Sequence, residues 1–192
     1  MGDSSSASGL ARRYFRQTAE LFGNNLYLDS VPDLSGQDDS LTLDSFREQI
    51  CKCVKCPLGR TRIKFVFGVG DPHADLVFVG EAPGRDEDLQ GEPFVGRAGQ
   101  LLDKILAAIK RSRDEVYICN ILKCRPPDNR TPHQNEIESC MPFLERQLNI
   151  IKPKLIVALG ATSAHALLKV KTPLGKLRSK KWKWKNFDLV IT

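Results

Sequence analysis

Six cysteines are the residues of this 192-residue sequence whose spacing points most directly to chemistry. Cys53 and Cys56 form a C-x2-C pair, Cys124 lies 68 residues further on, and Cys140 another 16. A C-x2-C turn allows two thiolates to bind one metal centre. Four thiolates gathered from distant segments suit either tetrahedral zinc or a cubane iron–sulfur cluster, and the spacing alone leaves both open.

The other two cysteines have different interpretations. Cys119 lies inside an apolar segment, where we expect a small core residue rather than a ligand. Cys51 could replace Cys53 as a ligand and give a C-x4-C pair, so that assignment stays open. The alternative without any metal is two buried cysteines and a chance C-x2-C.

Residues 80–103 form a second segment whose composition could support chemistry, because glycines, prolines and acids are concentrated there: GEAPGRDEDLQGEPFVGRAGQLLD. Glycines permit close backbone approach to a ligand, and a following helix offers N–H donors to an anion. There is no Walker lysine pattern and no G-x-G-x-x-G, which argues against an NTPase or a dinucleotide enzyme. We interpret the segment as a phosphate- or base-binding loop with acid or base groups. An ordinary loop with solvated acids is the alternative.

Alternating apolar strands and helices must position these residues. We predict strands at 75–80, 116–120 and 155–160, a strand-like end at 189–191, and helices from about 44 and over 97–110, 133–151 and 161–168. Such a pattern indicates an α/β fold, a three-layer α/β/α sandwich with a central parallel sheet. Ligands bind at the carboxyl ends of such strands, so the loops that start at Gly80, Asn120 and Gly160 should carry the site.

Charge divides the chain in two. Residues 1–50 hold 4 basic and 8 acidic residues, and residues 51–192 hold 25 basic and 15 acidic residues. The formal net charge of the whole chain is +6. We predict a flexible acidic extension at 1–43, with an amphipathic helix over 10–27 and a linker over 28–43. The main domain is then 44–192. The extension either docks a replication or repair partner or has no role.

The basic domain suggests a polyanion such as nucleic acid as partner. Residues 169–185 hold eight Lys and Arg and no acid. We expect phosphate contacts from four side chains: Arg125, Arg130, Lys180 and Lys181. A solvated β-hairpin with lysines on its wet face is the competing interpretation of 169–185. With 41 % hydrophobic residues, no apolar run near membrane-spanning length and no signal peptide, membrane, collagen-like and disulfide-scaffold classes are excluded.

Several ordered blocks resemble the iron–sulfur uracil-DNA glycosylases, family 4 of that superfamily. These are GEAPGRDED with GEPFVGRAGQLLD, VYICNILKCRPPDNRTP, the IESC ending at Cys140, and LIVALGATSAHALL. The resemblance implies a DNA repair enzyme that flips uracil out of DNA and hydrolyses its N-glycosidic bond with water, leaving an abasic site. It also implies a [4Fe–4S] cluster held by Cys53, Cys56, Cys124 and Cys140. We expect a monomer acting on single- or double-stranded DNA in the cytoplasm of a bacterial or archaeal cell, associated with the nucleoid.

The resemblance assigns roles in the base pocket. Phe94 is similar to the aromatic residue on which the flipped uracil stacks. The Asn120 amide can donate to uracil O4 and accept from N3–H, whereas cytosine presents the reverse pattern. Backbone N–H groups near Ala82 and Gly84 are expected to bind a uracil carbonyl.

Acidic residues of the glycine-rich segment take further roles. Glu81 and Glu87 fall on the family's acidic positions. Together with Asn120, they are the three residues that we expect to be catalytic. We expect Glu81 to position water or the loop, and Glu87 to line the pocket near C5 of the base, where it would exclude the thymine methyl. Asp86, Asp88 and Glu92 are expected to be solvated or to cap helices.

One departure concerns a His-containing motif that follows a strand resembling FDLVIT in this family. The chain ends at Thr192, where that motif should begin, so we expect a fragment that binds uracil-DNA poorly and cleaves it slowly. Two other classes remain open. One is a non-catalytic iron–sulfur nucleic-acid-binding module of the same fold, and the other is a zinc-bound structural domain.

Overall fold

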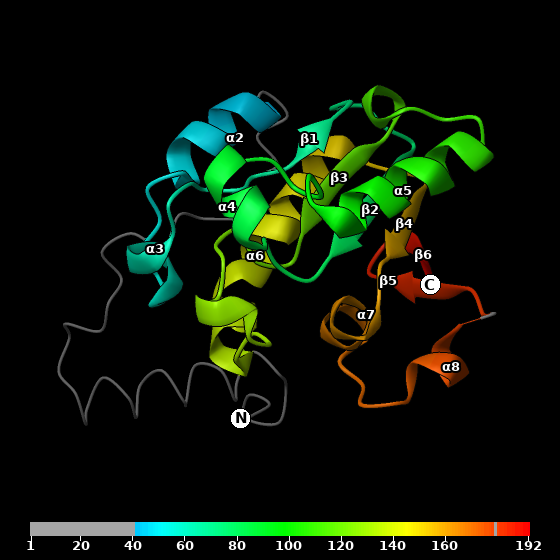
Figure 1. Ribbon diagram of the computed structural model, residues 1–192. Helices are drawn as coiled ribbons and strands as arrows, with labels where there is room; N and C mark the ends of the chain where they lie inside the picture. The colour runs from blue at the N-terminus through cyan, green and yellow to red at the C-terminus, as the bar shows by residue number, and fades with distance from the viewer. Residues whose placement is uncertain (1–40, 179) are drawn as a thin grey trace, which may run out of the picture. The chain divides into compact units, whose positions relative to one another are not determined.

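The computed structural model describes residues 41–178 and 180–192. They belong to one compact unit, Ser40–Thr192 (Figure 1). The helix expected over 10–27 and the linker over 28–43 fall almost wholly outside the described residues. Among the described residues, we find no helix with the length and apolar character needed to cross a membrane.

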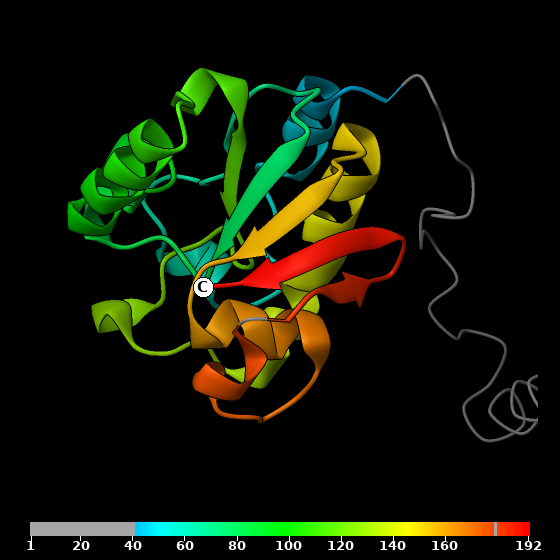
Figure 2. The ribbon, with the colours of Figure 1, turned by 90° about the vertical axis from the view of Figure 1, so that its right-hand side faces the viewer.

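A six-stranded mixed sheet forms the centre of this unit, in the order β1-β3-β2-β4-β6-β5 (Figure 2). The four central strands, β3, β2, β4 and β6, are parallel to one another. The outer strands β1 and β5 pair antiparallel with β3 and β6, so the sheet is not parallel throughout. The strands are β1 (Val69–Gly70), β2 (Leu76–Gly80), β3 (Tyr117–Asn120), β4 (Leu155–Ala158), β5 (Trp182–Trp184) and β6 (Phe187–Ile191).

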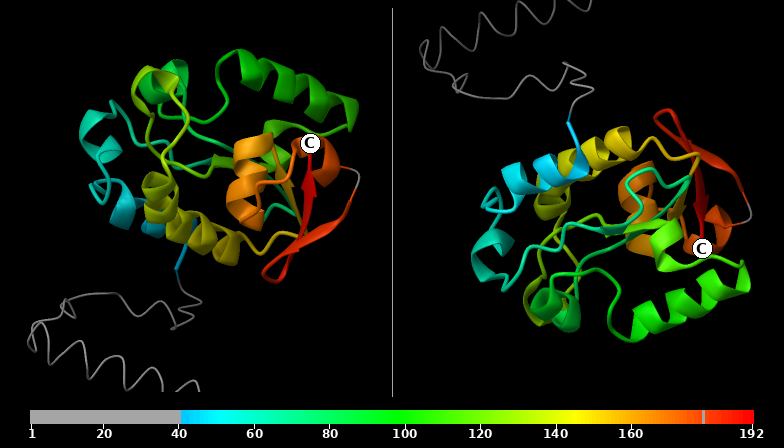
Figure 3. Two further views of the ribbon diagram at one scale, coloured as in Figure 1. Left: turned by 90° about the horizontal axis from the view of Figure 1, so that it is seen from below. Right: turned by 90° about the horizontal axis from the view of Figure 1, so that it is seen from above.

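Helices cover both faces of the sheet because the central strands are apolar on both sides. Phe78 of β2 packs with Leu102 and Leu106 of one helix, whereas its neighbours Val77 and Val79 join the larger core on the opposite face. Figure 3 shows α5 (Arg97–Ala108) on one side of the sheet and α2 (Leu43–Ile50) and α6 (Gln134–Ile151) on the other. The α/β fold predicted from the sequence is therefore confirmed.

The long helices begin and end close to their predicted positions, and three short helices, α3, α4 and α8, are additions. Of these, α4 lies inside the glycine-rich segment for which the sequence predicts a loop. Its N-terminus is fixed by Glu87, which accepts a hydrogen bond from the Gly84 N–H. The helices are α2 (Leu43–Ile50), α3 (Leu58–Thr61), α4 (Arg85–Gln90), α5 (Arg97–Ala108), α6 (Gln134–Ile151), α7 (Ala161–Leu168) and α8 (Leu174–Leu177), with short 3-10 turns η1 (Arg113–Glu115) and η2 (Pro127–Asn129).

Candidate active site and cysteine cluster

The ends of β2 and β3 bring three candidate residues together. Gly80 and Asn120 are direct partners in the parallel pairing of these strands. A methyl group at Gly80 would lie 2.4 Å from Oδ1 of Asn120 and 2.5 Å from Cζ of Phe94. The Asn120 amide and the Phe94 ring therefore meet over the bare backbone of Gly80, at the sheet edge where ligands are expected.

Asn120 has a buried acceptor with no partner. Its side chain is 2 % exposed, and Oδ1 makes no hydrogen bond within the described part of the chain. Buried polar atoms are normally paired, so an unpaired one next to an aromatic ring indicates that a ligand donor completes the site. The backbone here is fixed, because the buried Lys123 donates from Nζ to the Asn120 carbonyl at 2.8 Å. Burial lowers the pKa of Lys123.

We expect the substitution Gly80→Ala to reduce the activity of this site about 100-fold, because the added methyl must displace either the Phe94 ring or the Asn120 amide. Steady-state kinetics on a uracil-containing oligonucleotide, the substrate that the sequence resemblance implies, measure this effect. Gly175→Ala is the matched control, since no atom lies within 4 Å of a Cβ at that position. Equal activity of the two variants would mean that the space over Gly80 is not part of the site.

The Glu87 carboxylate is occupied by backbone groups. Its Oε2 accepts from the Gly84 N–H, and its Oε1 accepts from the Val95 and Gly96 N–H groups, each at 3.0 Å. The Gly84 N–H thus already has a partner in Glu87, and its contact with a uracil carbonyl stays a prediction. Glu87 ties both ends of the loop that carries Phe94, and its role near C5 stays a prediction.

The other acidic candidates differ in how deeply they are buried. Glu81 is half-buried directly after Gly80, and its carbonyl accepts from the Leu122 N–H at 3.0 Å. Its role with water, like that of the half-buried Ala82 backbone with a uracil carbonyl, stays a prediction. Asp88 is not solvated: it is 2 % exposed and accepts from the backbone N–H groups of Ile63 and Lys64. Asp86 and Glu92 are exposed.

Four cysteines from three segments lie near one another. Cys53 and Cys56 follow α2 and pack against the main core, Cys124 follows β3, and Cys140 is in α6. Burial raises the pKa of Cys124 to about 11, and the neighbouring Cys140 and Cys56 add to this effect. Burial also raises the pKa of Cys140, with further contributions from Cys56 and Cys53. These mutual effects single out the four residues of the predicted ligand set.

The surroundings of these sulfurs resemble those of a thiolate site. Arg62 donates to Cys124 Sγ at 3.3 Å and to the Cys53 carbonyl at 2.6 Å, and the Lys55 N–H lies 3.4 Å from Cys53 Sγ. Within residues 41–178 and 180–192, however, no group of three or more His, Cys, Asp or Glu side chains is arranged to hold a metal ion. The chemistry of the four cysteine donors fits a four-thiolate centre.

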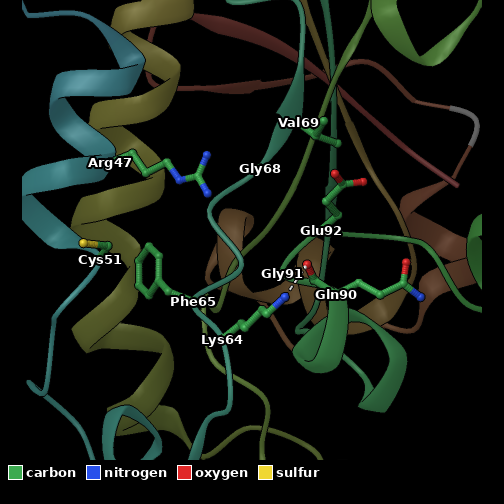
Figure 4. A pocket seen from close by; sticks show the side chains of 9 residues that line it. All are labelled: Arg47, Cys51, Lys64, Phe65, Gly68, Val69, Gln90, Gly91 and Glu92. Carbon is green, nitrogen blue, oxygen red and sulfur yellow. Dashed lines mark hydrogen bonds between the residues drawn. The ribbon is translucent and has the colours of Figure 1, made fainter.

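Cys51 belongs to a different part of the surface. Its thiol donates to the Glu48 carbonyl at 3.3 Å. It also lines a pocket of about 480 Å3 together with Arg47, Lys64 and Phe65, and Figure 4 shows it beside the Phe65 ring. This placement favours Cys53 over Cys51 as the partner of Cys56. Cys119 is fully buried in β3, as expected of a core residue.

Comparisons with known proteins identify the family. Residues 67–192 match the family described as the uracil DNA glycosylase superfamily. The chain is 46 % identical over 145 residues to a type-4 uracil-DNA glycosylase from Thermotoga maritima, covering 75 % of this chain and 76 % of that protein. It is 42 % identical over 157 residues to the type-4 enzyme of Sulfurisphaera tokodaii, covering 78 % and 71 %.

The chain belongs to the type-4 uracil-DNA glycosylases.

A further type-4 uracil-DNA glycosylase, from Archaeoglobus fulgidus, is 54 % identical over 124 residues. The match covers 65 % of this chain and 62 % of that relative, so less than two thirds of the relative's length is represented. The region shared with the superfamily contains Phe94, Asn120, Cys124 and Cys140, whereas the C-x2-C pair precedes residue 67.

The DNA-facing candidates of this family member are not equivalent. The Arg130 guanidinium already pairs with both oxygens of Glu136, at 2.7 and 2.9 Å, and its contact with phosphate stays a prediction. Arg125 donates from Nε to Asn129 Oδ1 at 2.7 Å. Lys180 and Lys181 are exposed just before β5 and make no ion pair with the described residues. The hairpin β5–β6 corresponds to the alternative interpretation of the lysine-rich segment, and contact with DNA stays a prediction.

The Arg130–Glu136 pair makes the stability of this glycosylase-family fold dependent on pH. Hydrogen bonds from Arg130 and from the His133 N–H hold the pKa of Glu136 below its usual 4.5. Because the pKa of Glu136 is lower in the folded than in the unfolded chain, its ionised form stabilises the folded protein at pH values above the unfolded pKa. This contribution is lost as pH falls through the folded-state pKa. We expect Glu136→Gln to lower Tm by about 3–6 °C at pH 7. The difference should shrink below about pH 4.5.

Thermal unfolding from pH 7 to pH 3 measures this difference. Glu138→Gln is the control on the same helix, because Glu138 is exposed and accepts only from the neighbouring Gln134 side chain. A Tm difference that stays constant over the whole range would exclude Glu136 as the titrating group.

Two residues of this family member were not found from the sequence. From the sequence, Lys123 is an ordinary lysine before a cysteine, and the neighbouring residues do not indicate that its side chain is buried against the Asn120 carbonyl. Asp88 is the last of four consecutive charged residues, RDED, and its burial depends on how α4 packs against residues 63–64. In both cases the burial of the side chain results from a tertiary contact, which the local sequence does not indicate.

Proposed function

We propose that this chain removes uracil from DNA by hydrolysing the N-glycosidic bond with water, leaving an abasic site. The unpaired, buried Oδ1 of Asn120 beside the Phe94 ring is the observation that carries the proposal. Uracil N3–H supplies the missing donor, and uracil O4 accepts from the same amide group. Cytosine presents an acceptor at N3 and a donor at C4, so it would leave these buried groups unpaired.

Binding the base in this pocket requires that it leave the DNA stack, which costs a few kcal/mol. Stacking on Phe94 and hydrogen bonds to Asn120 offset this cost. Thymine shares the hydrogen-bonding edge of uracil, so Asn120 alone does not exclude it. We assign rejection of its C5 methyl to Glu87, which also holds the loop of Phe94 through the Val95 and Gly96 N–H groups. Glu81, directly after Gly80, is the candidate for positioning water.

The proposal includes a [4Fe–4S] cluster with Cys53, Cys56, Cys124 and Cys140 as ligands. The mutual pKa effects among these cysteines and the N–H donors near their sulfurs support it. When bound, the cluster supplies a tie between the end of β3 and α6, and hydrolysis needs no redox step. Iron and sulfide analysis with absorbance at about 400 nm tests it, and stoichiometric zinc in a colourless protein would overturn it.

The substrate and setting follow from the same reasoning. We propose uracil-containing DNA, single- or double-stranded, held through exposed cations such as Lys180 and Lys181. We propose the cytoplasm of a bacterial or archaeal cell, in association with the nucleoid, as the location. A monomer is proposed, and a replication partner for residues 1–43 stays a proposal.

Uracil release from an end-labelled oligonucleotide with one uracil tests the function, with the matching thymine oligonucleotide as control. Release from the first and none from the second supports the glycosylase. Binding of both oligonucleotides without release would favour a non-catalytic nucleic-acid-binding module of the same fold.

A further inference from the structure

The backbone of the loop that carries Phe94 is held from two sides by opposite charges. On one side, Glu87 accepts from the Val95 and Gly96 N–H groups. On the other, Arg113 donates to the Pro93 carbonyl at 2.7 Å and to the Phe94 carbonyl at 3.1 Å. A carboxylate therefore holds the donors of this segment, and a guanidinium holds its acceptors.

The Phe94 backbone needs such support because its conformation is unfavourable. Its φ is 56°, in the left-handed region that residues other than glycine rarely adopt. Its carbonyl also approaches α5 so closely that a Cβ at Gly99 would lie 1.7 Å from the carbonyl oxygen. Relaxation of this backbone would move the ring away from Gly80 and Asn120.

Arg113 itself is fixed by two elements. Asp103 of α5 accepts from the same Nη1 at 2.8 Å, and the Arg113 side chain is 28 % exposed. Arg113 lies in η1, a few residues before β3, the strand that ends at Asn120. One guanidinium therefore connects α5, the segment leading into β3 and the loop that presents the ring.

We propose that Arg113 is a positioning residue that holds the Phe94 ring at the base pocket through the Pro93 and Phe94 carbonyls. The inference rests on the proposed function, in which that ring stacks on uracil. A Lys at this position carries the charge but not the planar fork needed to reach two carbonyls and a carboxylate.

A double-mutant cycle tests the proposal. Arg113→Gln should reduce kcat/KM for uracil release about 10- to 100-fold. The loss should appear mainly as a higher KM, since stacking acts in the bound ground state as well as in the transition state. In a Phe94→Leu background, the same Arg113→Gln change should have less than about a twofold effect. Equal losses in the two backgrounds would show that Arg113 acts on something other than the ring.

Arg111→Gln is the matched control. Arg111 lies two residues away, pairs with Glu115 at 3.0 Å and is 56 % exposed, so its loss should leave KM unchanged. Should Arg113→Gln fail to fold, Asp103→Asn provides a milder test. It leaves the guanidinium in place without its anchor and should raise KM in the same direction by a smaller factor.

Hydrogen–deuterium exchange separates this inference from the proposed function, because it needs no substrate. The Val95 and Gly96 amides should exchange at least about tenfold faster in Arg113→Gln than in the unmodified chain or in Arg111→Gln. Unchanged exchange would overturn the role of Arg113 even in an active enzyme. If the unmodified chain releases no uracil, the proposed function fails, and the exchange result still decides whether Arg113 fixes the loop.

Discussion

Replacement of Asn120 by aspartate is expected to reduce kcat/KM for uracil release by about 10³- to 10⁵-fold. The substitution keeps the size of the side chain but exchanges the amide NH2, the donor to uracil O4, for an oxygen. It also places a carboxylate at a site that is 2 % exposed, where an unpaired charge is strongly disfavoured. Single-turnover kinetics with excess enzyme measure the loss without interference from product release.

The control for this substitution is Asn135→Asp, which makes the same chemical change on the exposed first turn of α6. A negative charge at a helix N-terminus is tolerated, so Tm and activity should stay close to those of the unmodified chain. If Asn120→Asp retained more than about a tenth of the activity, the buried amide would not be the group that recognises uracil.

Replacement of Cys53 by serine is expected to remove most of the bound iron, the absorbance at about 400 nm and about 10 °C or more of Tm. The reason is that metal binding contributes directly to folding free energy where ligands come from distant segments. Cys53, Cys124 and Cys140 lie in three such segments. Iron analysis, visible spectra and calorimetry on one preparation give the three readouts together.

Cys51→Ser is the matched control, two residues away at the end of the same helix. Its thiol donates to Glu48 and faces the pocket with Arg47 and Phe65, so iron content should not change. The opposite pattern, with iron lost from Cys51→Ser and kept in Cys53→Ser, would establish a C-x4-C pair instead.

The central strands and long helices could be predicted because their signals are local. β2, β3 and β4 are short apolar runs buried on both faces, and α6 has a regular apolar period. β1 could not be predicted, because two residues ending in Gly70 carry no periodic signal. α4 was missed since its sequence, RDEDLQ, has one apolar residue, Leu89, which is exposed.

The site divides in a similar way. Asn120 and Phe94 could be named from the sequence, through a strand end and a family resemblance. Their convergence over Gly80 could not, because it depends on how a 14-residue segment folds back from β2. The ion pair of Arg130 could not be predicted either, because Arg130 contacts Glu136 only when the segment before α6 turns back toward that helix. Charge patterns indicate which side chains are cationic, and tertiary contacts decide which of them remain free.

The two short outer strands also influence how the protein behaves at high concentration. Long, flat, apolar edge strands act as templates for pairing with other molecules. Here β1 has only two residues, and a Cβ at its Gly70 would lie 1.9 Å from the Val116 carbonyl. At the opposite edge, β5 has three residues with the exposed Lys183 at its centre. Neither edge of the described sheet therefore offers a long, flat, apolar strand to which a second molecule could add its own strand.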